Sequence, residues 1–206
     1  MRYLYFVRHG QTYWNVENKI CGATDIALTD YGHEQAVETG KIILEQGLAF
    51  DEILYSPLVR ASETARHISE MTGVPMRAEP RLTEQCFGRF EATPRDGAEF
   101  RLAKEQFADR YDGGESMLQL AQRIYNLLDE IREDPQKKTY MLVAHNGIAR
   151  VVQSYFVSMS NSEYASFGVK NCAVLTYVLD GEKGLKEQSD ADAVRCPERA
   201  VRREDL

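Results

Sequence analysis

Short apolar stretches alternate with longer amphipathic stretches along most of the chain. Five short stretches predict strands, four of them rich in β-branched and aromatic side chains and the one at 75–78 weaker. They cover residues 3–7, 52–55, 75–78, 139–144 and 173–179. The longer stretches carry apolar residues at helical spacing and predict helices. They cover residues 28–47, 57–71, 116–132 and 148–157.

Local signals place the ends of these helices. Thr29 or Asp30 can cap the first helix, and Gly47 ends it, because glycine readily adopts the conformation that terminates helices. Ser56 is predicted to cap the second helix, with Pro57 in its first turn. Parallel strands need crossover connections that cover the sheet, so the alternation predicts an α/β fold. We expect a three-layer αβα sandwich with a mostly parallel central sheet.

Composition and charge narrow the possible functions. The chain has 206 residues, which suits one domain, and 43% of them are hydrophobic, which is enough for a core. A net charge of −7 disfavours nucleic acid and anionic membranes as partners. The first apolar stretch is too short for a signal peptide, and no stretch reaches the ~18 apolar residues of a membrane span. We therefore expect a cytoplasmic protein.

Residues 1–180 are expected to form the folded domain, and 181–206 a charged tail that is mobile or loosely docked. His33 and His67 lie within helical patterns, and we expect both to be ordinary satisfied side chains. The cysteines show no CxxC pair and no histidine at metal-ligand spacing, so we expect reduced thiols and no metal site. They are Cys21, Cys86, Cys172 and Cys196.

Polar residues of catalytic types follow the predicted strands. Arg8 and His9 follow the first strand, Arg60 the second, Glu84 the third and His145 the fourth. Ligands of open α/β sheets bind outside the carboxyl ends of the strands. One edge of the sheet would therefore gather two arginines, two histidines and a carboxylate.

The motifs around these residues occur in a recognisable order. They are RHGQT followed by WN, then LTDYGHEQA, SPLVRASETA, LTE with a downstream FGRFE, and AHNGIAR. Their order and placement resemble the histidine phosphatase superfamily, also called the phosphoglycerate-mutase-like family, over residues 3–179. The resemblance implies the fold of that family and phosphoryl transfer through a phosphohistidine.

The resemblance also implies a role for each candidate. His9 matches the nucleophile, whose imidazole nitrogen takes the phosphoryl group and so divides one displacement into two. Arg8 and Arg60 match the phosphate clamp, since guanidinium groups donate in pairs to phosphate oxygens. His145 matches the second pocket histidine, which holds charge on the transferring group. Glu84 matches the proton donor to the leaving group.

Further contacts to the substrate are implied around these residues. Asn15 matches the family's neutral amide donor, and the backbone amide of Gly10 could add another donor. Cys21, which precedes Gly22, stands where relatives carry glutamine, threonine or serine. Either Cys21 and Gly22 contact the substrate with one polar group fewer than in those relatives, or Cys21 is simply a buried residue. Asn146 replaces a glycine after the second histidine, a change that asparagine's tolerance of left-handed angles would accommodate.

Two glutamates compete for the role of proton donor. Glu84 stands in the LTE context of the family's acid. Glu91 occupies the place of the glutamate in the later G-x-W-E-G element, in which Phe90 and Ala92 replace the tryptophan and the second glycine. We therefore assign the role to Glu84.

Residues 85–115 are expected to form an insert on the substrate side. Arg89 and Arg95 are candidates for the pocket wall in this insert. A helix is predicted over residues 98–110, and Phe100 and Phe107, one helical face apart, are expected to pack it onto the sheet.

The spacing favours hydrolysis over mutase activity. Glu84 and His145 are 61 positions apart, fewer than such phosphoglycerate mutases typically carry, and a mutase needs a lid that excludes water. We predict a metal-independent phosphomonoesterase that needs no cofactor and acts on a small phosphorylated metabolite, with a homodimer left open. The alternatives are a phosphoglycerate-mutase-type phosphotransferase, a phosphatase dedicated to α-ribazole phosphate or a sugar bisphosphate, and a phospho-ligand-binding relative without turnover.

Overall fold

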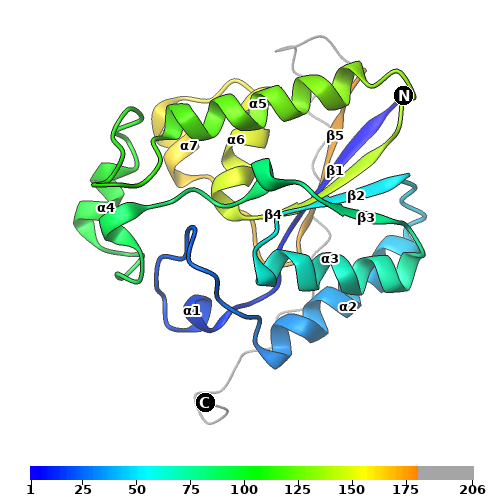
Figure 1. Ribbon diagram of the computed structural model, residues 1–206, viewed down its shortest axis with the longest axis horizontal. Helices are drawn as coiled ribbons and strands as arrows, with labels where there is room; N and C mark the ends of the chain where they lie inside the picture. The colour runs from blue at the N-terminus through cyan, green and yellow to red at the C-terminus, as the bar shows by residue number, and fades with distance from the viewer. Residues whose placement is uncertain (181–206) are drawn as a thin grey trace.

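The computed structural model describes residues 1–180, so the predicted tail and Cys196 lie outside the described residues. Its centre is a five-stranded sheet with the order β3-β2-β4-β1-β5 (Figure 1). The strands are β1 (Tyr3–Arg8), β2 (Glu52–Tyr55), β3 (Met76–Ala78), β4 (Tyr140–Ala144) and β5 (Val174–Val178). The pairs β1–β4, β2–β4 and β2–β3 are parallel, and β5 lies antiparallel to β1 at one edge. The mostly parallel sheet is confirmed.

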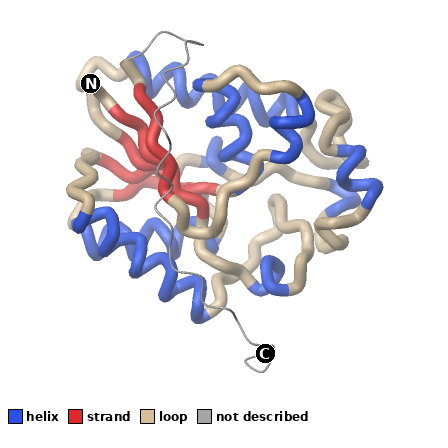
Figure 2. Tube along the Cα trace, turned by 180° about the vertical axis from the view of Figure 1, so that it is seen from behind, coloured by secondary structure: helices blue, strands red, loops and turns tan. Residues whose placement is uncertain are grey.

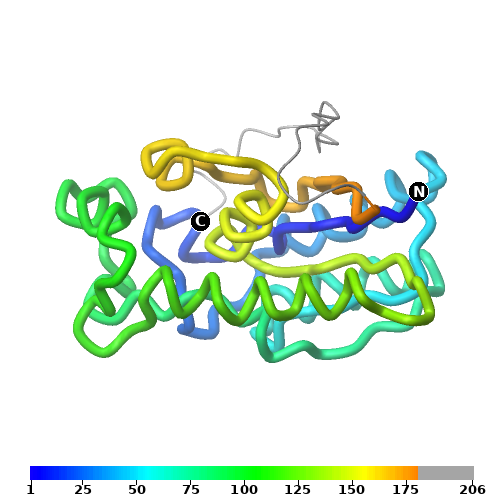
Figure 3. The backbone as a smooth tube through the Cα atoms, turned by 90° about the horizontal axis from the view of Figure 1, so that it is seen from above, coloured from blue at the N-terminus to red at the C-terminus, as the bar shows by residue number. Residues whose placement is uncertain are grey.

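Helices cover both faces of the sheet, which confirms the three-layer α/β prediction (Figures 1 and 3). The main helices are α2 (Asp30–Glu45), α3 (Val59–Thr72), α5 (Met117–Glu133) and α6 (Asn146–Phe156). Successive side chains of a strand point to opposite faces. Accordingly, Tyr5 and Val7 of β1 pack in one cluster with residues of α2 and α3, and Leu4 and Phe6 pack in another with α5 and α6. The core therefore has one apolar layer on each side of the sheet.

Shorter elements lie at the end of the sheet where long loops gather (Figure 2). They are α1 (Tyr13–Val16), η1 (Pro80–Leu82), η2 (Gly88–Phe90), α4 (Ala98–Ala103) and, after α6, α7 (Asn161–Ser166). The helix predicted over 98–110 is thus only α4. Phe100 packs with Phe87, Phe90 and Tyr111 in a small separate cluster, so the expectation that it packs onto the sheet is wrong. Phe107 does pack against the main core.

The predicted helix ends are confirmed at α2 but not at α3. The Thr29 hydroxyl accepts from Gly32 N at the start of α2, and Gly47 follows the helix with a φ of 65°. The α3 helix begins at Val59 with no side-chain cap, so Ser56 does not cap it. The Ser56 hydroxyl lies against His145 instead, which gives it a place in the site.

None of the helices in residues 1–180 has both the length and the apolar character needed to cross a bilayer.

Candidate active site

A pocket of about 100 Å³ lies beyond the carboxyl ends of the central strands. It is lined by Arg8, His9, Asn15, Ile20, Cys21, Glu84, Phe87, Arg95, Phe100, Lys104, Asn146, Gly147 and Arg150. The structure therefore brings together residues from the loops after β1, η1 and β4. Arg60, His145, Gly10 and Gly22 were predicted to bind substrate, but they do not line this pocket.

His9 is buried at the pocket, and its hydrogen bonds fix the tautomer of the ring. It follows β1, its N–H donates to Ala144 O of β4 at 2.9 Å, and only 4% of the residue is exposed. Its Nδ1 lies 2.7 Å from Gly10 O. A carbonyl oxygen can only accept, so Nδ1 carries the hydrogen and Nε2 keeps its lone pair. Burial, followed by the Arg60 and Arg8 charges, lowers the pKa of His9 well below its usual range, which keeps the ring neutral.

His145 and Arg60 form a buried pair next to His9. The two histidine rings have centroids 5.1 Å apart. Arg60 Nε donates to His145 Nδ1 at 3.2 Å, so His145 Nε2 carries the hydrogen and donates to Ser56 Oγ at 2.7 Å. Burial and the Arg60 charge lower the pKa of His145 well below its usual range. Both side chains are fully buried, and neither lines the pocket.

Two further donors of Arg60 are bound by backbone carbonyls. Nη1 donates to Thr24 O at 2.9 Å and Nη2 to Gly22 O at 2.7 Å. These bonds use three of the five N–H groups of Arg60, and the phosphate-clamp role that the resemblance implies stays a prediction. Arg60 places a positive charge beside His9, and no carboxylate pairs with Arg60 among the ion pairs of residues 1–180.

Arg8 and Asn15 offer donors to an anion in the pocket. Arg8 Nη1 donates to Val169 O, whereas its buried Nε has no partner within the described part of the chain. Burial, then the charge of Arg95, lowers the pKa of Arg8 to about 10, so the group remains a cation at neutral pH. Asn15 Oδ1 accepts from Thr12 N and from Asn171 Nδ2, which leaves the Asn15 amide N–H groups for a ligand.

Glu84 and Glu91 have different surroundings. Glu84 is 5% exposed and lines the pocket, and its oxygens accept from Gly147 N and Gln85 N, both at 2.9 Å. The Glu91 carboxylate accepts five hydrogen bonds from the loop 22–24 and from Phe87 N, at 2.7–3.3 Å. Glu91 therefore supports the loop whose carbonyls hold Arg60. This arrangement favours Glu84 as the group that exchanges a proton with substrate.

Three expected contacts take a different form in the structure. Gly10 N–H donates to Thr64 Oγ1 at 3.0 Å, so this amide is not available to a phosphate. Cys21 lines the pocket, and burial raises the pKa of its thiol to about 11, which keeps it protonated. Asn146 begins α6 with a right-handed backbone, so its tolerance of left-handed angles is not used. Its Oδ1 accepts from Val169 N at 2.8 Å.

Three further cations line the pocket, of which the sequence had suggested one. Arg95, Lys104 and Arg150 each donate to a backbone carbonyl, of Lys19, Ala165 and Phe167 respectively. No carboxylate pairs with any of the three within residues 1–180. Burial lowers the pKa of each, and in Lys104 the neighbouring arginine charges contribute. The pocket therefore concentrates positive charge.

Arg89, the other arginine proposed for the pocket wall, is exposed and lies outside it. Its guanidinium pairs with Asp112 and Glu99, both at 2.8 Å. Arg150 was missed although it stands one helical turn after Asn146, a spacing that places both on one face of α6. Lys104 follows the end of α4, and no pattern in the sequence distinguishes it from a solvated lysine.

Comparison with known proteins decides the family. The sequence matches the profile of the histidine phosphatase superfamily (branch 1) over residues 4–190. The chain belongs to this superfamily. The match confirms the resemblance drawn from the sequence motifs. A probable phosphoglycerate mutase from Erwinia tasmaniensis is 30% identical over 181 residues, which cover 84% of this chain and 83% of the relative. A probable phosphoglycerate mutase from Yersinia pestis shares the same identity over the same length.

Solved structures of histidine phosphatases share the fold. A mycobacterial glucosyl-3-phosphoglycerate phosphatase, solved in complex with VO3, is 26% identical with a TM-score of 0.73, covering 85% of this chain and 90% of its own. The α-ribazole phosphatase from Shigella flexneri is 24% identical, with a TM-score of 0.70. The match covers 84% of this chain and 89% of the Shigella chain, and it shows only that the two proteins share a fold. The names of these relatives include both phosphatases and mutases.

Proposed function

We propose that this protein is a metal-independent phosphomonoesterase that hydrolyses a small phosphorylated metabolite through a phosphohistidine on His9. The observation that carries the proposal is the state of the His9 ring. Its Nδ1–H is held by Gly10 O, so Nε2 keeps its lone pair, and the charges of Arg60 and Arg8 act on the ring. A neutral imidazole next to unneutralised cations is suited to attack a phosphate dianion.

The reaction has two displacements. In the first, His9 Nε2 forms a bond to phosphorus while the bond to the leaving oxygen breaks, and protonated Glu84 gives its proton to that oxygen. In the second, Glu84 takes a proton from water, the water oxygen attacks phosphorus, and the bond to Nε2 breaks to release phosphate. Arg8 and the Asn15 amide hold the non-bridging oxygens. The positive charge of Arg60, which is buried and does not line the pocket, also stabilises the anion.

The cations of the pocket support a substrate with a second acidic group. One phosphate dianion facing Arg8 leaves Arg95, Lys104 and Arg150 without counter-charge. A carboxylate or a second phosphate on the leaving group would pair with them. A hydrogen bond to a charged group contributes about 1.5–3 kcal/mol, which corresponds to about tenfold to a hundredfold in kcat/KM.

A matched pair of substrates tests this preference. 3-Phosphoglycerate and glycerol 3-phosphate differ only in a carboxylate where the second has a hydroxymethyl group. We expect Arg150→Gln to lower kcat/KM for 3-phosphoglycerate and to leave glycerol 3-phosphate nearly unchanged. Arg89→Gln is the control, because Arg89 is exposed and ion-paired outside the pocket. Equal losses on both substrates would contradict the second anion site.

Phosphate release tests the proposed reaction itself. We expect steady-state release from a phosphomonoester to persist after treatment with a chelator and to disappear in His9→Ala. Acid-labile phosphate should label the wild-type protein and not the variant. A protein that binds phosphate without releasing it from esters would be a phospho-ligand-binding relative, and the proposal would be wrong.

Mutase activity is the second candidate because relatives at 30% identity are named as probable phosphoglycerate mutases. The same assay distinguishes it. Interconversion of 2- and 3-phosphoglycerate that is faster than phosphate release would make transfer the main activity. The short separation of 61 positions from Glu84 to His145 supports hydrolysis.

A further inference from the structure

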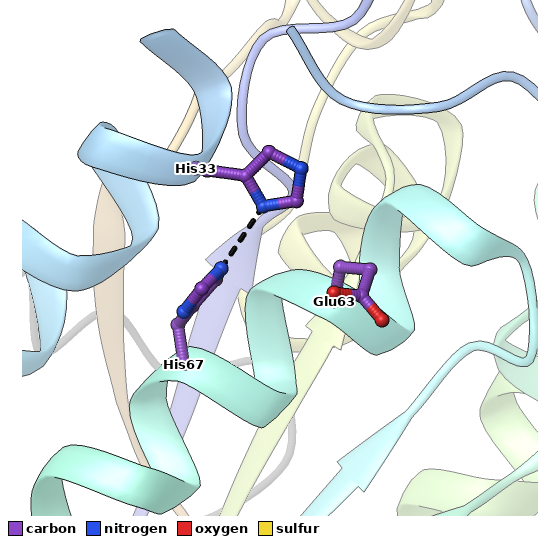
Figure 4. Close-up of side chains that lie close together, drawn as sticks. All are labelled: His33, Glu63 and His67. Carbon is purple, nitrogen blue, oxygen red and sulfur yellow. Dashed lines mark hydrogen bonds between the residues drawn. The ribbon is translucent and has the colours of Figure 1, made fainter. Parts of the chain in front are cut away.

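Two histidines and a glutamate meet outside the pocket, between helices α2 and α3 (Figure 4). His33 lies near the start of α2, and Glu63 and His67 lie on α3. Nδ1 of His33 is 2.9 Å from Nε2 of His67, and one ligand atom from each residue lies within 4.8 Å of the other two. The two histidines that the sequence indicated to be ordinary helix residues therefore form a cluster of metal-ligating groups.

The packing of the two helices creates this cluster. Glu63 and His67 are four residues apart and so share one face of α3. Further along, a Cβ at Gly40 of α2 would lie 2.9 Å from the Met71 side chain of α3, so the helices are closely packed there. The helices run side by side in the same direction, and His33 faces the early turns of α3.

We propose that His33, Glu63 and His67 bind one divalent transition-metal ion of the zinc class. Two imidazole nitrogens and one carboxylate oxygen form a donor set that zinc accepts in proteins, with water in the remaining position. Magnesium and calcium prefer sites built from oxygen. Zinc–nitrogen bonds of about 2.0–2.1 Å in a tetrahedron place two nitrogens about 3.3 Å apart. The observed 2.9 Å between the rings needs to widen by only a few tenths of an ångström.

The charged groups around the cluster support a cation there. Nδ1 of His67 lies 4.0 Å from Glu70 Oε2, and metal-bound histidines commonly donate their second N–H to such a carboxylate. Arg66 donates to Glu63 Oε2 at 2.7 Å and to Glu70 Oε1 at 2.6 Å, which fixes both carboxylates. The charges of these three groups, Arg66, Glu63 and Glu70, sum to −1 beside the two imidazole rings.

The position of the site indicates a supporting role for the ion. Thr64 and Gly32 are sequence neighbours of two proposed ligands, and both contact the loop after β1. Gly10 N–H donates to Thr64 Oγ1 at 3.0 Å, and a Cβ at Gly32 would lie 2.1 Å from Gln11 O. A bound ion would join the two helices that hold the His9 loop without touching the phosphate. The inference does not depend on the proposed activity.

Calorimetric titration of the metal-stripped full chain with zinc chloride, in a buffer free of phosphate, tests the site. We expect one zinc ion per chain. His67→Ala should raise the Kd at least a hundredfold, and Glu63→Gln about tenfold, because losing a ligand removes more than weakening one. His9→Ala is the control, since it removes a histidine of the pocket and should leave the Kd unchanged.

Thermal unfolding provides a second measurement. Zinc should raise the Tm of the wild type and of His9→Ala, and should leave His67→Ala unchanged. His33→Asn replaces His67→Ala if the latter does not fold, as judged by its circular dichroism in the absence of metal. Absence of zinc binding in the wild type would overturn the proposal and leave the pair as a hydrogen bond between helices. Zinc binding that is lost in His9→Ala but kept in the His67 and His33 variants would also overturn it.

Discussion

Replacing Glu84 and Glu91 by glutamine, one at a time, should separate proton transfer from loop support. The two glutamates are seven residues apart and were both candidates for the same role. Glu84 lines the pocket, whereas Glu91 collects hydrogen bonds from the loop 22–24 and from Phe87. We expect Glu84→Gln to lower kcat/KM for substrates whose leaving group needs a proton, and Glu91→Gln to lower the free energy of unfolding.

The hydrogen bonds of Glu91 determine how much Glu91→Gln should lower the free energy of unfolding. A glutamine oxygen in place of Oε2 keeps the contacts from Gly22 and Thr24, but its NH₂ group then faces the N–H groups of Ala23 and Phe87, both 3.0 Å from Oε1. A hydrogen bond to a charged acceptor contributes about 1.5–3 kcal/mol. The carboxylate is partly exposed, so the lower value applies, and two lost bonds reduce the free energy of unfolding by about 3 kcal/mol. That corresponds to a Tm lower by about 6–12 °C.

The Glu84 effect should depend on the leaving group. An alkyl phosphate needs a proton on the departing oxygen, so Glu84→Gln is expected to lower its kcat/KM by about 10²–10⁴. p-Nitrophenyl phosphate releases a stable anion and should lose much less. The quantity to compare is kcat/KM, because it reports the first phosphoryl transfer. Glu91→Gln should lower kcat/KM for both substrates by a similar factor.

One result would refute this reasoning. If Glu91→Gln affected alkyl phosphate far more than p-nitrophenyl phosphate, while Glu84→Gln slowed both equally, the two roles would have to be exchanged. A Tm that is unchanged in Glu91→Gln would separately show that its five hydrogen bonds do not support the fold.

Three further perturbations test the support of the site. Below pH 6.5 the free energy of unfolding should fall by up to about 1.4 kcal/mol per pH unit for each of His9 and His145, because both stay neutral in the folded protein and take a proton in the unfolded chain. Urea unfolding at several pH values measures this free energy. A free energy of unfolding that does not change with pH would contradict the prediction. Ser56→Ala leaves His145 Nε2–H without its acceptor and should cost about 1–3 kcal/mol in urea unfolding, whereas a change below about 0.5 kcal/mol would speak against it. Gly10→Ala places a Cβ 2.4 Å from Gly32 O and should lower the Tm and the phosphatase activity together, and a normal melting curve would count against this clash.

The layered fold could be predicted from the sequence because each element carries its own local signal. The YLYFV stretch of β1 and the capped amphipathic pattern of α2 depend on neighbouring residues, and both appear as expected. The positions of Arg8, His9 and Glu84 could also be predicted, since parallel strands bring their carboxyl ends to one edge.

Contacts between distant segments could not be predicted in the same way. Ser56 has the residue type and position of a helix cap, yet its hydroxyl is used by His145, 89 residues away. No local pattern around Arg60 shows that two of its donors bind carbonyls of the loop 22–24. His33 and His67 are 34 residues apart on two helices, a separation that no short ligand motif spans.

The unneutralised cations of the pocket have a consequence for turnover. Orthophosphate, the product of the proposed reaction, carries the same dianionic group as the substrate and meets the same donors on Arg8 and Asn15. The positive charges that bind the phosphoryl group of the substrate also bind the released phosphate. We therefore expect product inhibition by free phosphate, and we expect the rate of phosphate release to set an upper limit on kcat.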